Sequence, residues 1–491
     1  MSNGSPAHHE NKGYGMWLAW ADTEARPAEA IFFPETGNRK PFRNPKLETL
    51  FPAIMTTKLE IISNTEFVAL VDVFADELLD LCQFFVSQIE GKLPDTERLF
   101  ARLSYASKLV EDLLDYHGAK NNQQWYRYRE LVASILNFSE AAFTMKHIVS
   151  RISFYEIGAD EAFLFASQLV HRFLINTLTN LCQELIIETR KMGLKLSPTT
   201  LAREQFANLS TNRYLEFNIL PQDLYDERQH IVRITTAYLN IVRDFELLGF
   251  YKRFPTGELR ELIPARISEE ILRKYEMIIH NLQSSYDTYI GRDASRSESS
   301  KFKALRDHIS ISLHLLELSG RLAHYFERHL YDVGRSGIYL EVQQLLAHLV
   351  NTEFLLDAII NYAVFSCNAF LTRGKSLAQS LLNQYIEHGE ITVGVPVKLG
   401  FHSRPCMLVA KIVQHYGGQV EMIVAEDHFD ASSILDLQWA GGKVQRENLS
   451  QVKFRGDARA LADITILAAI NYGEDTMGKG IPLPPELSYL R

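Results

Sequence analysis

The sequence predicts a multidomain protein in which a large antiparallel bundle of helices is followed by a small C-terminal α/β domain. Only five of the 16 prolines lie between Pro52 and Pro396. A long stretch with few prolines favours long helices, because proline breaks helix interiors. The apolar residues of this stretch recur every three or four positions, as on one face of a helix. After Gly389 they alternate with other residues instead, which is typical of strands.

The first helical run begins directly after residue 62. Ser63 and Glu66 form a capping box in front of apolar residues that recur from Phe67 to Phe85. Further helices are expected at residues 95–118, 122–155, 160–193, 222–248, 268–290, 298–333, 338–372 and 375–388. Helices of this length with short connections favour an antiparallel bundle or two packed bundles. Residues 292–297 are expected to form a solvated loop between two of them.

Four segments are therefore expected along the chain. Residues 1–62 are a proline-rich irregular segment, residues 63–390 the all-helical bundle domain, residues 391–475 the small α/β domain and residues 476–491 a proline-rich tail. The tail carries Ile481, Leu483, Leu487, Tyr489 and Leu490, which would be exposed if it were free. We therefore expect the tail to dock in a groove of the helical region.

The composition argues against several classes of protein. The net charge is −9 and no basic stripe is present, which argues against nucleic-acid binding. The four cysteines form no CxxC pair, which excludes the usual cysteine-based metal frameworks and is typical of a reducing cytoplasm. The N-terminus does not resemble a secretion signal, and the longest charge-free apolar stretch, residues 358–371, is too short to span a bilayer. The sequence predicts a cytoplasmic protein without membrane insertion, cofactor or metal.

The small domain is expected to have the element order βαββαβα. Val393, Val395 and Val397 form one alternating pattern, and Val420, Met422 and Val424 form another. Helices fit residues 404–416, 433–439 and 457–471, and a strand fits residues 452–454.

The segment Gly400-Phe401-His402-Ser403-Arg404-Pro405 stands where the first strand of this domain meets its first helix. It places His402 at the N-cap, and Pro405 suits the first turn because its missing N–H costs nothing there. The free N–H groups from Ser403 to Cys406 and the helix dipole form an anion site beside the imidazole. Histidine forms covalent intermediates, and a phosphoryl group is the one that such a site would hold best.

These residues resemble the signature of HPr, the histidine-containing phosphocarrier of the bacterial sugar phosphotransferase system: Gly, a hydrophobic residue, His, a small residue, Arg, Pro. Residues 430–435 are similar to the segment that opens the second helix of the family, and residues 452–458 to its last strand and the start of its last helix. The resemblance covers residues 392–474 and implies an open-faced β-sandwich. The helical region resembles no family that we recognise.

The resemblance implies a role for three residues. His402 would accept phosphate from an enzyme I-like donor and Arg404 would stabilise the phosphoryl group, while the helix N-terminus itself predicts that the backbone of Ser403 and Cys406 binds it. Ser433 would be the target of an HPr kinase. Cys406 departs from the usual small residue, and residues 440–448 replace a shorter glycine-rich turn.

Simpler interpretations remain open for these residues. His402 could cap a helix in a fold that no longer transfers phosphate, and Ser433 could be an ordinary N-cap. In the helical region, the acidic motifs at residues 76–80 and 112–115 could hold magnesium, although acidic residues at this spacing are usually solvated. His308, His314, His324 and His329 share one expected helix and are interpreted as structural rather than metal-binding.

The sequence thus favours a phosphotransferase-linked regulatory protein, in which a phosphohistidine in the HPr-like domain signals through the helical domain to a protein partner. The alternatives are a helical-domain enzyme that the HPr-like module regulates, and a module for protein interaction that is not phosphorylated. We expect an apolar surface at Phe401, Met407 and Ile434 beside His402, covered by the helical domain because the connection between the domains is short.

Overall fold

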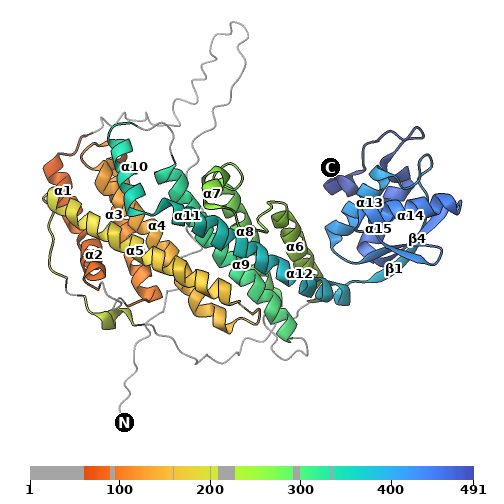
Figure 1. Ribbon diagram of the computed structural model, residues 1–491, viewed down its shortest axis with the longest axis horizontal. Coiled ribbons are helices and arrows are strands. Elements are labelled where there is room, and N and C mark those ends of the chain that lie inside the picture. Colours follow the sequence, from red (N-terminus) through yellow and green to blue (C-terminus); the bar gives the residue numbers. More distant parts are fainter. Residues whose placement is uncertain are drawn as a thin grey trace, which may run out of the picture. The chain divides into compact units, whose positions relative to one another are not determined.

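The computed structural model describes residues 60–88, 94–158, 160–199, 201–207, 227–290, 299–331 and 336–490. The expected N-terminal segment up to residue 59 and the expected loop at residues 292–297 lie outside these ranges. The described residues from Ser63 onward belong to one unit, in which a helical body precedes a small sheet domain (Figure 1).

The helical body confirms the prediction of a largely helical region. Its helices are α1 (Asn64–Phe74), α2 (Asp76–Ser87), α3 (Glu97–Tyr116), α4 (Tyr126–Arg151), α5 (Glu161–Lys191), α6 (Glu227–Glu246), α7 (Thr256–Leu262), α8 (Glu269–Tyr289), α9 (Ser299–Tyr325), α10 (Ile338–Leu349), α11 (Thr352–Asp357) and α12 (Phe365–Tyr385). The long helix α4 packs against α3, α5 and α9, while α9 also packs against α8 and α12. The apolar faces that the sequence indicated form the contacts between these helices.

Several helix ends differ from the expected ones. The expected helix at 338–372 is interrupted after α10, because Asn351 caps a new helix by accepting a hydrogen bond from the Phe354 N–H at 3.1 Å. The chain then continues through a π-helical segment, Ala358–Val364, into α12. The break expected between residues 372 and 375 does not occur, because α12 continues through Gly374. At this glycine α12 approaches α6 closely, and a Cβ added to Gly374 would lie 2.1 Å from the hydroxyl oxygen of Tyr238.

The stretch Thr352–Tyr385 is the one described helix that is long and apolar enough to cross a membrane. In its most apolar window 78% is buried inside the structure, and the helix packs against α6 and α9. A buried core helix of a folded domain has the same properties.

The sheet domain contains β1 (His388–Gly394), α13 (Ser403–Tyr416), β2 (Val420–Val424), β3 (Asp427–Asp430), α14 (Ile434–Arg446), β4 (Gln451–Asp457) and α15 (Ala458–Ala469). The four strands are antiparallel and lie in the order β1-β4-β2-β3. Along β4, Val452 and Phe454 are buried while Lys453 and Arg455 are exposed, so helices cover one face of the sheet and the other face is open.

Two elements of this domain differ from expectation. The first strand ends at Gly394, and Val397 lies outside it with 77% of its surface exposed. The second helix, α14, extends to Arg446, so most of the segment 440–448 is helix rather than a long turn. Gly441 permits this extension because a Cβ there would be 2.7 Å from the carbonyl oxygen of Phe401.

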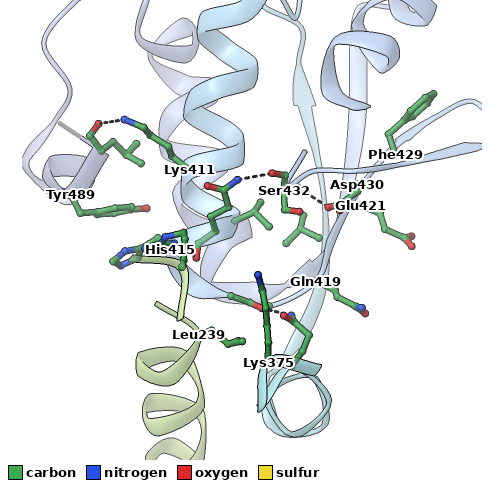
Figure 2. Close-up of a pocket in the computed structure, with 18 of the residues that line it drawn as sticks. Leu239, Lys375, Lys411, His415, Gln419, Glu421, Phe429, Asp430, Ser432 and Tyr489 are labelled. Carbon is green, nitrogen blue, oxygen red and sulfur yellow. Dashed lines mark hydrogen bonds between the residues drawn. The ribbon is translucent and has the colours of Figure 1, made fainter. Parts of the chain in front are cut away.

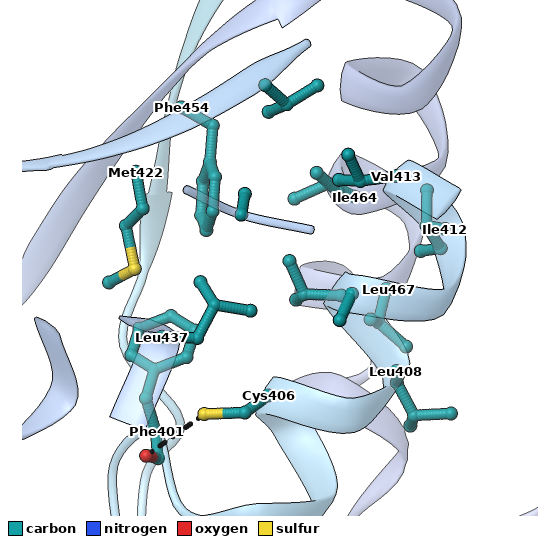
Figure 3. Close-up of a cluster of buried hydrophobic side chains, with 14 of the residues drawn as sticks. Phe401, Cys406, Leu408, Ile412, Val413, Met422, Leu437, Phe454, Ile464 and Leu467 are labelled. Atoms are coloured by element: carbon teal, nitrogen blue, oxygen red, sulfur yellow. Dashed lines mark hydrogen bonds between the residues drawn. The ribbon is translucent and has the colours of Figure 1, made fainter. Parts of the chain in front are cut away.

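The core of the sheet domain includes the chain's tail. Phe401, Cys406, Leu437 and Phe454 point toward one another beneath the sheet (Figure 3). Leu487 and Leu490 of the tail belong to the same buried cluster. The expectation that the tail docks on the helical region is therefore wrong for these residues, because their side chains complete the core of the sheet domain.

The helical body meets the sheet domain at the C-terminal end of α13. The last carbonyl groups of a helix lack partners within it. In α13 they accept hydrogen bonds from α6: Arg243 donates to Gln414 at 2.7 Å, Asn240 to His415 at 3.1 Å and Thr236 to Tyr416 at 3.2 Å. Three side chains on one face of α6 thus cap α13.

Candidate functional site

The segment that carries His402 forms a tight turn followed by the first turn of α13. Gly400 has a φ of +59°, a conformation that glycine adopts without strain. His402 is the N-cap residue, and its side chain makes no capping hydrogen bond. The imidazole is 30% exposed and therefore accessible from solvent.

The backbone around His402 offers fewer free N–H groups than the sequence indicated. The N–H of Cys406 donates to the carbonyl oxygen of His402 at 3.2 Å, as in a regular first turn, and Pro405 has no N–H. The structure records no partner for the N–H groups of Ser403 and Arg404 among the described residues. The backbone site for an anion therefore consists of Ser403 and Arg404 rather than Cys406.

Cys406 is a core residue. It is fully buried, and its thiol donates to the carbonyl oxygen of Phe401 at 3.2 Å (Figure 3). Burial raises the pKa of the Cys406 thiol to about 12. The thiol is therefore protonated at neutral pH, and its contribution is to packing beneath the turn.

A buried carboxylate holds the imidazole of His402. Nε2 of His402 lies 2.9 Å from Oε1 and 3.0 Å from Oε2 of Glu474, whose side chain is 1% exposed. A carboxylate accepts hydrogen bonds, so Nε2 carries the proton that is shared with Glu474. The other ring nitrogen, Nδ1, has no recorded partner among the described residues and keeps its lone pair free.

Arg404 contacts the same carboxylate, that of Glu474. Its Nη1 is 3.5 Å from Oε1 of Glu474 and 3.5 Å from the carbonyl oxygen of Gly478. Both distances are at the upper limit for hydrogen bonds. Glu474 therefore brings together the two residues, His402 and Arg404, to which the sequence assigned the chemistry.

Ser433 is the N-cap residue of α14. Its hydroxyl accepts a hydrogen bond from the Asp436 N–H at 3.2 Å, and its own N–H donates to the Asp430 carbonyl oxygen at 3.1 Å. Its side chain thus has a structural role, as the simpler interpretation stated, and it remains partly exposed.

Apolar side chains are exposed on α13 and α14, which pack against each other beside His402. Phe401 is not among them, because it is only 3% exposed and its ring packs against Tyr472 in the core. Those exposed are Met407 at 38%, Ile434 at 41%, Leu435 at 54% and Trp439 at 62%. These four residues are called the α13–α14 surface below.

The helical body does not cover the α13–α14 surface in the part of the chain that the structure describes. Its hydrogen bonds to α13 from α6 are at Gln414, His415 and Tyr416, whereas His402 precedes the first residue of the helix, and the four side chains of the surface are 38–62% exposed. A helix of this length separates its ends by about 20 Å. The expectation of a covered surface is therefore wrong.

A crevice of about 1010 Å³ lies between the helical body and the sheet domain (Figure 2). Its walls come from α6 and α12 on one side and from α13, β2 and β3 on the other. Three cations line it, but each has a partner: Arg243 binds Gln414, Lys375 binds Glu246 at 3.1 Å and Lys411 binds the Leu490 carbonyl oxygen. The crevice does not include His402.

Three side chains of the acidic motifs in the helical region are held in ion pairs. Glu77 pairs with Arg102, Asp112 with Lys108, and Asp115 with Arg129. Among the described residues, no group of three or more histidine, cysteine or acidic side chains is arranged to hold a metal ion.

The histidines of α9 and of the π-helical segment Phe326–Leu330 that follows it pair with glutamates. His314 contacts Glu317, His324 contacts Glu269 and His329 contacts Glu130. His308 instead is buried, and this burial lowers its pKa to about 4. These contacts support the structural interpretation of the cluster.

The chain matches no known family model, and no curated protein or solved structure is significantly similar to it.

Proposed function

We propose that the C-terminal domain accepts a phosphoryl group on Nδ1 of His402 from an enzyme I-like donor, and that the protein is a regulatory component linked to the phosphotransferase system. The observation that carries the proposal is the hydrogen bond between Nε2 of His402 and Glu474 at the N-terminus of α13. It leaves Nδ1 as the ring nitrogen with a free lone pair. The HPr-like signature and an antiparallel sheet with one open face support the same proposal.

The residues around the ring suit this reaction. Nδ1 attacks the phosphorus atom, the new N–P bond forms, and the electron pair of the breaking bond leaves with the donor atom. The proton on Nε2 stays on the ring, whose positive charge is balanced by the Glu474 carboxylate. The free N–H groups of Ser403 and Arg404 and the helix dipole favour the added negative charge.

A regulatory role is preferred to that of a free carrier because the sheet domain is attached to a large helical body. The α13–α14 surface offers exposed apolar side chains for the donor and for an output protein. Phosphorylation of Ser433 by an HPr kinase would place charge at the N-terminus of α14, where the helix dipole favours it and Asp436 opposes it. An interaction module without phosphorylation would use the same surface. The alternative of an enzyme in the helical body is weaker, because Glu77, Asp112 and Asp115 of its acidic motifs are held in ion pairs.

Labelling with phosphoenolpyruvate, enzyme I and magnesium tests the proposal. The full chain is expected to take up one phosphoryl group that is labile in acid and stable in base. His402→Ala is expected to abolish the label, whereas His428→Ala, which changes an exposed histidine on β3, is expected to retain it. An unlabelled wild-type chain, or a His402→Ala chain that is labelled as fully as the wild type, would refute phosphorylation at His402.

A further inference from the structure

The chain beyond Glu474 lies along α13 from one end of this helix to the other. At the first end, Gly480 lies so close to Arg404 that a Cβ on the glycine would be 3.0 Å from Nη1. In the middle, Leu483 and Leu408 of α13 both lie beside Gly473. Residues 475–490 are called the strap below.

The far end of the strap lies at the C-terminal end of α13. The ring of Tyr489 stacks on that of His415 with centroids 4.0 Å apart, and Lys411 donates to the Leu490 carbonyl oxygen at 3.3 Å (Figure 2). His415 is also the residue whose carbonyl oxygen accepts from Asn240 of α6. The strap thus connects the surroundings of His402 with the contact between α13 and the helical body.

The near end of the strap is a turn with its own hydrogen bonds. Asp475 accepts from the N–H groups of Met477 and Lys479, each at 2.8 Å, and its own N–H donates to the Lys479 carbonyl oxygen at 2.8 Å. Lys398 donates to the Met477 carbonyl oxygen at 2.8 Å. Arg404 adds the contact with Gly478, which at 3.5 Å is long and easily exchanged for a better one.

A phosphoryl group on Nδ1 supplies that better partner. It carries about two negative charges and three acceptor oxygens. A guanidinium group binds such an anion through two parallel hydrogen bonds, which are stronger than a bond to a neutral carbonyl oxygen. Arg404 is one position from the N1 residue of α13 and can turn from the Gly478 carbonyl oxygen to the phosphoryl oxygens. Glu474 keeps its hydrogen bond to Nε2. The loss of the Arg404 contact therefore affects the strap and leaves Glu474 in place.

We propose that the strap is held at its near end by Arg404 in the unphosphorylated protein, and that phosphorylation of His402 withdraws Arg404 and loosens the strap as far as the contact with α6. The inference rests on the proposed function and names the regulation of that site. Through the strap, a change of charge at His402 would affect the opposite end of α13, where the helical body is bound.

Hydrogen exchange of the full chain, unphosphorylated and phosphorylated, tests the inference. Amides of residues 475–481 are expected to exchange about 2- to 10-fold faster after phosphorylation, as for the loss of one ordinary hydrogen bond. A smaller increase in the same direction is expected at residues 485–490. Unchanged exchange at 475–481 in a fully labelled chain would overturn the inference and leave the proposed function standing. A change confined to 475–481 would overturn the connection to α6.

Two variants separate this inference from the proposed function. Arg404→Ala, without any phosphorylation, is expected to raise exchange at residues 475–481 by a similar factor. Arg446→Ala is the control, because Arg446 is an exposed arginine at the end of α14 in the same domain. If Arg404→Ala leaves the strap as protected as Arg446→Ala does, Arg404 does not hold it and the inference fails even where His402 is labelled. If the wild type takes no label, the proposed function fails, and release by phosphorylation fails with it.

Discussion

Glu474 lies 72 residues after His402 in the chain, yet its carboxylate contacts the imidazole Nε2 at 2.9 Å from a position where it is 1% exposed. A buried carboxylate on one ring nitrogen fixes both the orientation of the ring and the nitrogen that carries the proton. Glu474 is therefore a positioning residue for the proposed reaction at Nδ1.

Removing the Glu474 carboxylate should slow phosphorylation of His402. We expect Glu474→Ala to reduce the initial rate of labelling by about 10-fold, as for other residues that orient a functional histidine. Glu474→Gln should lose less, because its amide oxygen still accepts from Nε2–H while the negative charge is gone. Nitrogen NMR of the His402 ring should show a single tautomer in the wild type and in Glu474→Gln, and a mixture in Glu474→Ala. Glu486→Ala, an exposed position in the strap, serves as the control. An alanine variant that is labelled at the rate of this control would contradict the positioning role.

The sheet domain should need the tail for its full stability when it is made as a separate fragment. A fragment of residues 391–475 lacks the start of β1 and the buried Leu487 and Leu490. Full burial of a leucine contributes about 1.5–3 kcal/mol, so this fragment should lose several kcal/mol relative to residues 387–491. Urea unfolding followed by far-UV circular dichroism should give a cooperative transition for the longer fragment and a much lower midpoint for the shorter one. Equal midpoints would show that the tail contributes no stability.

The helices were predictable because their signals are local. Ser63 and Glu66 form the expected capping box, with the Glu66 N–H donating to the Ser63 hydroxyl at 3.3 Å. The change of apolar period near Gly389 coincides with the start of β1 at His388. The order of elements in the sheet domain also follows the pattern of the sequence, because alternation and capping act within a few residues.

The features that the sequence did not indicate depend on contacts between distant segments. A break was expected between residues 372 and 375, but α12 continues through Gly374, which lets it approach Tyr238. Phe401 was expected in the apolar surface beside His402 because the resembled family docks its partners there, whereas the turn at Gly400 directs it into the core. Glu474 has no motif of its own, and the nearby glycines at 473, 478 and 480 indicate only a tight turn. His402 and Arg404 could be identified from the sequence, but not the carboxylate that joins them.

His308 should make the stability of the protein depend on pH. Its imidazole is 7% exposed, and burial lowers its pKa to about 4, against about 6.5 for an unfolded chain. Between these values the unfolded state binds a proton that the folded state does not, so stability falls as pH decreases from about 6.5 to 4. Between pH 7 and pH 4, the free energy of unfolding should therefore decrease by about 2–3 kcal/mol less in His308→Gln than in the wild type, as measured by urea unfolding. The exposed His280→Gln is the control, and a pH profile for His308→Gln that follows this control would refute the assignment.

The contact between α13 and the helical body can be tested at Gly417, which ends α13. Gly417 has a φ of +72°, and a Cβ there would be 2.9 Å from Cδ1 of Leu239 on α6. Gly193 has a φ of +70° with no atom within 4 Å of its Cβ position, so it is a matched control for the backbone cost alone. That cost is about 1–2 kcal/mol.

Gly417→Ala should therefore destabilise the protein more than Gly193→Ala, by about 1 kcal/mol for the displaced Leu239. The Gln379 side chain of α12 donates to the Gly417 carbonyl oxygen. Backbone amides near Gln379 and at the end of α6 should therefore exchange faster in Gly417→Ala. The rate at which His402 is labelled should change by less than about twofold, because this residue lies at the opposite end of α13, about 20 Å away. Equal destabilisation by the two alanine substitutions would mean that Leu239 does not press on this glycine. A large loss of labelling in Gly417→Ala alone would mean that the contact with the helical body also maintains the proposed phosphorylation site.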